Sequence, residues 1–386
     1  MAGIYFHFPF CRQACHYCNF HFSTQLKYQK EMLQAFHKEI ELRTEELTNE
    51  LESIYFGGGS PSLISPQSID HLINVLMKKF KIHKKIEITI EVNPDDVSYE
   101  YLLALSSIGI NRLSIGVQSF IDAELKLMNR IHNADQAIKT INWTVKLFDN
   151  FSIDLIYGAP SSDFSSWKKN LNQALSYNVP HLSSYALTVE PKTILAYKVK
   201  NKEVQLMDDD RVKSQYDWML YRMEEAGYEN YEFSNFSKLG YNAVNNSNYW
   251  RGKAYMGIGP AAHSFDGHRK RSWNISNNIK YLKSIQKGIL PSEFENLSTH
   301  EAFNEYLMTG LRTSWGVSLQ MINQTFGKRY SYYLEKQVES HLIDQRLYWD
   351  GDALIVSKKA KFLTDGIASD LFLLKNRLYI FLCNSE

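Results

Sequence analysis

The chain has 386 residues, with 43 lysines and arginines against 42 aspartates and glutamates, and it contains four cysteines. This balance of charge argues against a general nucleic-acid binder, which usually carries a basic excess. No apolar run reaches the roughly 18 residues of a membrane span. The first ten residues lack the basic start and long apolar centre of a signal peptide. We therefore expect a cytoplasmic protein without a membrane span, in which peripheral contact with a membrane stays open.

Short strand-like runs alternate with helical patterns through the first two thirds of the chain. A strand is predicted over residues 4–8, and the helix that follows carries Met32, Phe36 and Ile40 on one face. Further strands are predicted over 51–56, 86–92, 112–117, 151–157 and 181–187. Helices are predicted after residue 65, over 99–108, twice within 122–147 with a break near Asn133, and over 165–177. Such a series is typical of the α/β class with a parallel sheet. Six units predict a partial or complete TIM-like (β/α) barrel with functional residues at the carboxyl ends of its strands.

The rhythm changes after about residue 190. A long helix is predicted over 208–226, followed by an aromatic-rich segment over 228–250. From residue 298 the pattern predicts two helices and then two short strands, over 347–349 and 353–356, which is typical of a small winged-helix-like α+β module. We therefore predict a barrel with its extension over residues 1–290 and a C-terminal domain over 291–386.

Three of the four cysteines form a C-x3-C-x2-C motif at Cys11, Cys15 and Cys18, in the loop after the first predicted strand. A disulfide framework would need an even, dispersed set in an oxidising compartment. Three thiolates from one loop can bind three irons of a [4Fe–4S] cluster and leave the fourth iron open to a small chelating molecule. A zinc site with His16 or His21 as its fourth ligand is an alternative, as are three thiols without metal.

Polar residues follow several of the predicted strands. Glu91 follows residues 86–90, Gln118 follows residues 114–117, and Asp154 interrupts the strand over 151–157. One such residue alone usually caps a helix or anchors a loop. Several at one end of one barrel favour a site. Arg130 ends the helix after Gln118, and an interaction with the helix dipole is its alternative role. The glycines at 57–59 would admit a closely approaching ligand, although a tight turn needs them equally.

The cysteine spacing after the first strand of a βα barrel resembles the radical S-adenosylmethionine (SAM) superfamily. Within it, the chain resembles the HemN/HemW family, which contains oxygen-independent coproporphyrinogen III oxidase and a haem chaperone. The similarity runs through essentially the whole chain. It is carried by residues 5–11, 56–61, 91–95, 116–120, 154–160, 255–259 and 311–313.

This resemblance implies a set of cofactor sites. It implies a [4Fe–4S] cluster on the three clustered cysteines and one SAM beside Tyr5, Gly58 and Glu91. The family's second SAM position corresponds to Tyr17, Gly59, Ser60, Gln118, Arg130, Asp154 and Ala186.

Two features are typical of the chaperone branch. The oxidase pattern adds a cysteine two residues after the third one, and this chain has Phe20 at that position. The oxidase also carries an N-terminal extension before the cluster motif, whereas this chain begins ten residues before Cys11. Segments 187–191, 231–236 and 248–250 also resemble the chaperone branch. The resemblance therefore implies binding of haem and its transfer to acceptor proteins, with an electron donor that the sequence does not identify. SAM-dependent oxidative decarboxylation of coproporphyrinogen III is the alternative function.

One departure concerns haem. The chaperone branch has a His-Asn-x-x-Tyr-Trp segment implicated in haem contact, and this chain has Asn245 where the histidine is expected. Asparagine is a poor iron ligand beside imidazole. His263 is an alternative ligand or else a structural histidine. Tyr249 and Trp250 could stack on a porphyrin or pack in the core. Cys383 we expect to be packed or partner-bound.

Overall fold

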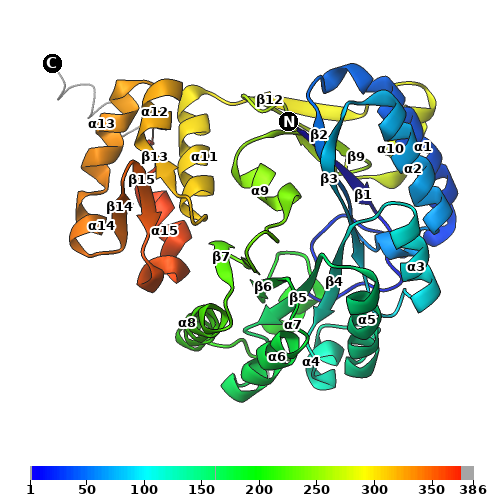
Figure 1. The fold of residues 1–386 in the computed structure, drawn as a ribbon, viewed down its shortest axis with the longest axis horizontal. Coiled ribbons are helices and arrows are strands. Elements are labelled where there is room, and N and C mark those ends of the chain that lie inside the picture. The colour runs from blue at the N-terminus through cyan, green and yellow to red at the C-terminus, as the bar shows by residue number, and fades with distance from the viewer. Residues whose placement is uncertain (1, 161, 375–386) are drawn as a thin grey trace.

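The computed structural model describes residues 2–160 and 162–374, so the expectation for Cys383 lies outside the described residues. Figure 1 shows a curved sheet with helices along its outer side and a separate C-terminal module beside its open side. Six consecutive parallel strands form the centre of the sheet. They are β1 (Ala2–Phe8), β2 (Leu51–Gly58), β3 (Ile82–Val92), β4 (Arg112–Gln118), β5 (Phe151–Tyr157) and β6 (His181–Ala186).

The helices that connect these strands confirm the predicted βα series. They are α1 (Gln29–Leu42), α2 (Pro66–Lys79), α3 (Tyr99–Ser107), α4 (Asp122–Leu127), α5 (Ala134–Leu147) and α6 (Phe164–Ser176). Ser65 caps α2 by accepting from the Ser68 amide, and Asn133 forms a capping box at the start of α5. The predicted break near Asn133 is therefore confirmed.

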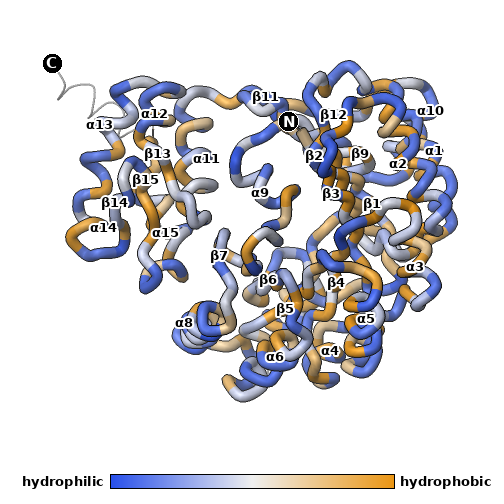
Figure 2. Tube along the Cα trace, in the orientation of Figure 1, coloured by the Kyte–Doolittle hydropathy of each residue, from blue (hydrophilic) through white to orange (hydrophobic). Residues whose placement is uncertain are grey.

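Side chains alternate between two very different faces of the strands. Ile4, Phe6 and Phe8 of β1 are buried in the core between the sheet and its helices, as are the corresponding apolar residues of the other strands. Figure 2 shows this apolar lining along the strands and the polar outer turns. On the opposite face Tyr5 pairs with Tyr55. Side chains with hydroxyl, carboxyl and guanidinium groups lie on the same face of β2 to β6. The inside of the curve is therefore polar and suited to a site.

The sheet extends beyond the six predicted strands on both sides. β9 (Ala254–Ile258) runs parallel to β1 and continues through β10 (His263–Phe265) and β11 (Lys270–Asn274) to β12 (Ser292–Asn296). On the other side β8 (Asn235–Ser237) is antiparallel to β6 and pairs with β7 (Glu229–Glu232). In the part of the chain that the structure describes, β7 and β12 are the two edges, so the barrel is open.

Helices after residue 190 complete this part of the chain. α7 (Ile194–Lys200), α8 (Asp209–Glu225) and α10 (Asn278–Gln286) accompany the sheet, and α9 (Val244–Trp250) lies on its open side (Figure 1). The Glu87 carboxylate of β3 accepts hydrogen bonds from the Val244 and Asn245 amides at 2.9 and 3.0 Å. These two hydrogen bonds join the start of α9 to the polar inner face of the sheet.

The C-terminal module has its own apolar core, which begins at Phe303. It contains α11 (Thr299–Leu311), α12 (Leu319–Thr325), α13 (Lys328–Gln337), α14 (Glu339–Ile343) and α15 (Thr364–Asp370). Its sheet has the order β13 (Val317–Ser318), β15 (Ala353–Val356), β14 (Leu347–Asp350). The two predicted strands are confirmed. The sequence predicts two helices before these strands, whereas the structure has four, α11 to α14. β12 still pairs with β11, so it belongs to the first sheet. No described helix is long and apolar enough to cross a membrane.

Candidate functional site

Main-chain hydrogen bonds hold the cysteine loop from two sides. The Gly59 and Ser60 amides donate to the carbonyls of Phe8 and Phe10 at 2.8 and 2.7 Å. From the other side the His16 amide donates to the Met128 carbonyl at 3.0 Å. The Asn129 side chain donates to the Ala14 carbonyl at 2.7 Å, and Gln13 donates back to the Asn129 carbonyl at 2.9 Å. The loop is therefore fixed between the β2 turn and the segment after α4.

The glycine run after β2 is required by close packing. Gly58 has φ +109°, and a Cβ on Gly59 would lie 2.6 Å from the Phe10 carbonyl oxygen. A Cβ on Gly57 would lie 2.9 Å from Glu91 Oε1. Close contacts at Gly57 and Gly59 and the positive φ of Gly58 therefore account for this glycine run. The same turn also brings the Gly58 amide to the site, so the two explanations coincide.

A first cavity of about 570 Å³ opens at the carboxyl ends of the strands. Its volume lies within the range of small-molecule sites. All of the residues predicted for the cluster and for the two SAM positions line it except Tyr5. These residues are Cys11, Cys15, Tyr17, Cys18, Gly58, Gly59, Ser60, Glu91, Gln118, Arg130, Asp154 and Ala186.

The three cysteines are half-buried along the wall of the first cavity. Burial raises the pKa of the Cys11 thiol to about 12, and the nearby Cys18 and Cys15 act in the same direction. Burial also raises the pKa of the Cys18 thiol. Such thiols stay protonated until a cationic centre stabilises their thiolates. Arg130 supplies part of that positive charge, with its Nη1 3.5 Å from Cys15 Sγ.

The two histidines considered as zinc ligands face other partners. His16 Nδ1 lies 2.8 Å from the Leu127 carbonyl, and His21 Nε2 lies 2.7 Å from Asn278 Oδ1. Across residues 2–160 and 162–374, no three His, Cys, Asp or Glu side chains are grouped around a single ion. A closed zinc site needs four ligands around one ion. Each of these histidines has one ring nitrogen engaged, and the zinc alternative stays a prediction.

The Glu91 carboxylate is the main anionic group of the first cavity. It accepts a hydrogen bond from the Tyr55 hydroxyl at 2.9 Å and one from the Gly58 amide at 3.2 Å. Burial raises its pKa to about 7, and the charge of Asp154 adds to the rise. A cation bound here would favour the ionised form. The position therefore suits the amino group of a ligand.

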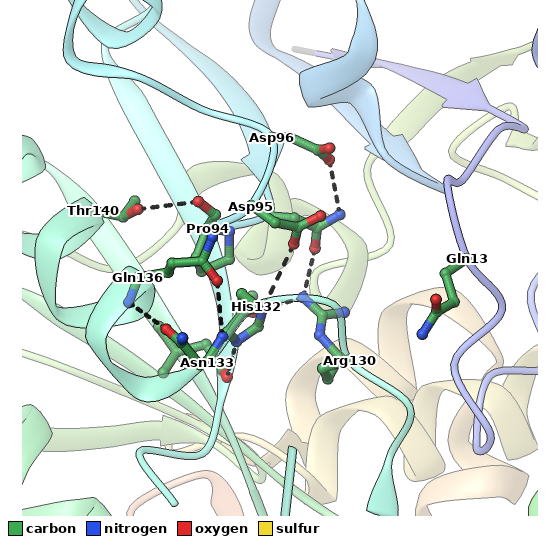
Figure 3. A network of polar contacts seen from close by, with 12 residues as sticks. Gln13, Pro94, Asp95, Asp96, Arg130, His132, Asn133, Gln136 and Thr140 are labelled. Carbon is green, nitrogen blue, oxygen red and sulfur yellow. Dashed lines mark hydrogen bonds and ion pairs between the residues drawn. The ribbon is translucent and has the colours of Figure 1, made fainter. Parts of the chain in front are cut away.

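Arg130 occupies a different place from the one predicted. It lies three residues beyond the end of α4, and its side chain points into the site, so the helix-dipole alternative is wrong. Its Nη2 donates to Asn93 Oδ1 at 2.6 Å and to the Gly116 carbonyl at 2.8 Å. Figure 3 shows the Arg130 side chain beside the segment of Asp95 and Asp96. Within the described chain its buried Nε has no hydrogen-bond partner. An anionic ligand group could satisfy this nitrogen.

Asp154 and Gln118 reach the cavity from β5 and β4. The Ser114 hydroxyl lies 3.2 Å from one Asp154 oxygen, and burial raises the pKa of the Asp154 carboxyl. Gln118 has φ +65° after an irregular register between β4 and β5. A positive φ at a non-glycine residue is costly and is often found at functional sites.

A second cavity of about 760 Å³ lies on the other side of a shared wall. The wall consists of Asn19, Phe20, Phe22, Gly58 and Glu91, which line both cavities. The remaining lining residues of the second cavity are Tyr5, His7, His21, Tyr249, Tyr255, Ala261, His263 and Ser276.

The haem candidates divide between this cavity and the interior. Tyr249 and His263 line the second cavity. Asn245 is only 6% exposed, accepts from the Ser53 hydroxyl at 3.1 Å and contacts the Tyr249 hydroxyl. Trp250 lies 5.5 Å from the Arg312 guanidinium. Neither Asn245 nor Trp250 lines either cavity.

Sequence reasoning missed three residues that organise the first cavity. Tyr55 orients Glu91, Asn93 orients Arg130, and Asn129 holds the cysteine loop. Asn93 lies in the segment 91–95 that carried the family resemblance, so a signal for it was present. Tyr55 occupies an inward position of β2, and its strand alternation could have identified it.

Comparisons with known proteins agree on the family. The radical SAM superfamily model matches residues 5–174. Heme chaperone HemW of Bacillus subtilis is 32% identical over 334 residues, which cover 85% of this chain and 88% of that protein. The mouse protein named radical S-adenosyl methionine domain-containing protein 1, mitochondrial, is 33% identical over 337 residues, with coverages of 83% and 75%.

A solved structure shares the fold of nearly the whole chain. It is coproporphyrinogen III oxidase (HemN) from Escherichia coli, described as a radical SAM enzyme, with a TM-score of 0.82 and 21% identity. The likeness covers 96% of this chain and 90% of that one. Together with the motif-bearing loop and strand ends, these matches show that the chain belongs to the HemN/HemW family of the radical SAM superfamily.

Proposed function

We propose that this protein is a haem chaperone that carries a [4Fe–4S] cluster and SAM and transfers haem to acceptor proteins. One observation supports the cofactor part most strongly: three thiols on one anchored loop share a cavity with the Glu91 carboxylate. The chaperone part rests on relatives such as the Bacillus subtilis protein, whose name is Heme chaperone HemW.

The donor set fits an iron–sulfur cluster. Cys11, Cys15 and Cys18 would each hold one iron, which leaves the fourth iron without a protein ligand. A bound cluster supplies an open coordination position for SAM and the electron that reductive cleavage of SAM uses. Arg130, beside Cys15, supplies a hydrogen-bond donor to the sulfur side of the site. Such donors tune the reduction potential of clusters.

The polar residues around the thiols fit a zwitterionic ligand such as SAM. Glu91 would pair with its amino group, with Gly58 and Tyr5 beside it, although Tyr5 lines the neighbouring cavity. A second SAM position would use Tyr17, Gly59, Ser60, Gln118, Arg130, Asp154 and Ala186. The unsatisfied Arg130 Nε and the buried Asp154 carboxyl offer it one cationic and one anionic contact.

Phe20 favours the chaperone over coproporphyrinogen III oxidation. It stands where the oxidase pattern has a further cysteine, and its side chain is 67% exposed between the two cavities. A bulky apolar group at this place changes the boundary of the cluster cavity. The electron donor and the haem acceptors remain to be found by capture on the loaded protein.

The experiment is a paired assay on one anaerobically reconstituted preparation. We expect stoichiometric binding of ferric haem, seen in the Soret region, followed by transfer to an apo-haem protein, and no turnover of coproporphyrinogen III with SAM and a reductant. Absence of haem binding would contradict the chaperone proposal. Formation of protoporphyrinogen IX would favour the oxidase instead. A Cys18→Ala variant carried through the same assay separates cluster-dependent from cluster-independent binding.

A further inference from the structure

Each of the three clustered thiols has a hydrogen-bond donor beside it. The Ser60 hydroxyl contacts the Cys11 sulfur, and Arg130 Nη1 lies 3.5 Å from the Cys15 sulfur. The donor to Cys18 is a main-chain amide of the loop itself. Two of the three donors are therefore side chains from other segments, and they need support to keep their direction.

The side-chain amide of Asn93 supports both of these donors. Its Oδ1 accepts from Arg130 Nη2 at 2.6 Å, and its Nδ2 donates to Ser60 Oγ at 2.8 Å. Because Ser60 Oγ already accepts this bond, its own hydrogen is free to point at Cys11. Because Nη2 of the guanidinium is engaged, the other terminal nitrogen, Nη1, is turned toward Cys15. One amide thus links the donors to two different sulfurs.

Asn93 is itself held in one orientation. Its main-chain amide donates to the Ser62 hydroxyl at 3.3 Å, and that hydroxyl donates to Asp96 Oδ2 at 2.9 Å. Asn93 Nδ2 also lies 3.3 Å from the same Asp96 oxygen. The Asp96 side chain is 1% exposed, and its other oxygen lies 2.9 Å from Nε of Arg12, within the cysteine loop. Such a supporting shell fixes the groups that face a functional site.

We propose that Asn93 is a positioning residue that raises the reduction potential of the cluster by directing Ser60 and Arg130 at two of its thiolates. This inference rests on the cofactor part of the proposed function and adds a residue that controls it. Hydrogen bonds to the thiolates stabilise the negative charge that a cluster gains on reduction. An amide can do this for both donors because it accepts through oxygen and donates through nitrogen, whereas alanine does neither.

The test is an anaerobic redox titration of the reconstituted full-length protein, without SAM, followed by the paramagnetic resonance signal of the reduced cluster. Asn93→Ala should keep the iron and sulfide content of the wild type. At a fixed ambient potential its ratio of reduced to oxidised cluster should fall about tenfold, which is a shift of about 59 mV for one electron. Asn74→Ala, which removes an exposed asparagine on α2, should titrate as the wild type.

A double-substitution background tests the route of the effect. When Ser60→Ala and Arg130→Met are both present, adding Asn93→Ala should cause no further shift, because both donors are already gone. A further tenfold shift in that background would show that Asn93 acts on the cluster by another route, and the positioning role would be wrong.

The remaining outcomes separate this inference from the proposed function. If wild-type protein assembles no cluster, the cofactor part of the proposed function fails and this inference fails with it. If wild-type protein and Asn93→Ala hold the cluster at the same potential, only this inference is overturned. Ser62→Ala removes a support of Asn93 and leaves both donors in place, so it should shift the ratio in the same direction by less. If Asn93→Ala holds no cluster, an unshifted Ser62→Ala overturns the inference.

Discussion

The two cavities are built from different kinds of sequence. The first is lined by one loop and by the carboxyl ends of successive strands, so a regular βα pattern brings its residues together. The second is lined by β1, by α9 and by the turn between β9 and β10, which are far apart in the chain. The three thiols line only the first cavity and the three imidazoles only the second, whereas Glu91 and aromatic rings line both.

The comparison shows that a wall shared by two cavities can separate a group of thiols from a group of imidazoles. Glu91 and Gly58 face both cavities, and Phe20 projects between them. Of the residues expected around the first SAM, Gly58 and Glu91 line both cavities and Tyr5 lines the second, so a ligand held by all three would reach both sides of this wall. The following predictions test whether the two cavities act as separate sites, beginning with the largest expected effect.

Replacing any one of Cys11, Cys15 or Cys18 by alanine should abolish the brown cluster absorbance after anaerobic reconstitution, because two thiolates cannot hold the cube. Iron and sulfide analysis with the visible spectrum measures the effect. Cys383→Ala removes the remaining cysteine and is the matched control. A cluster retained in full by one of the three variants would refute that residue as a ligand.

Replacing Arg43 by methionine should destabilise the barrel by about 3–5 kcal/mol, because it leaves the buried Glu39 carboxylate without its cation. Urea unfolding measures the change. The turn between β9 and β10 should loosen, because Arg43 also bonds the Gly257 carbonyl and the Ser264 hydroxyl. Arg346→Met breaks only the exposed pair with Asp344, which is worth about 1 kcal/mol or less. Equal effects of the two variants would contradict the role of the buried pair.

SAM affinity should rise with pH through about 7, because the Glu91 carboxyl ionises there and only its ionised form pairs with an amino group. The same raised pKa means that the ligand-free protein gains stability from protonated Glu91 at low pH and loses it as pH rises through about 7. Glu91→Gln should weaken SAM about 10- to 100-fold. Equilibrium dialysis from pH 6 to 8 measures both effects. If the SAM affinity of Glu91→Gln rose with pH as the wild type's does, Glu91 would not be the group that ionises.

Asn245→His should have the smallest effect and leave the Soret band of the haem complex unchanged. Its side chain is buried between Ser53 and Tyr249, away from the lining of both cavities. Absorbance spectra of the variant and the wild type, compared at equal haem loading, measure the effect. The appearance of a new six-coordinate spectrum would show that position 245 reaches the iron.

Much of the first cavity could be predicted from the sequence, because local spacing determines it. The cysteine motif follows the first predicted strand, Glu91 and Asp154 lie within predicted strands, and all of them line one cavity. Arg130 was expected at a helix end, but α4 ends at Leu127 and the left-handed residue Asn129 turns the chain before it. Asparagine is a recognised helix-stop residue, so a local signal for this turn was present. The burial of the Asn245 side chain could not be predicted, because it depends on the hydrogen bond that joins the Glu87 carboxylate to the start of α9. The strands β7 to β12 are short and lack a clear alternation.

The main-chain bonds from Gly59, Ser60 and His16 to their partners have a consequence for cofactor assembly. They use no part of the cluster, so the loop is preorganised and its conformational entropy is lost during folding rather than during metal uptake. The apoprotein should therefore present its three thiols together, and its amide exchange in this loop should slow only slightly upon reconstitution. Assembly would then depend on the supply of iron and sulfide rather than on refolding.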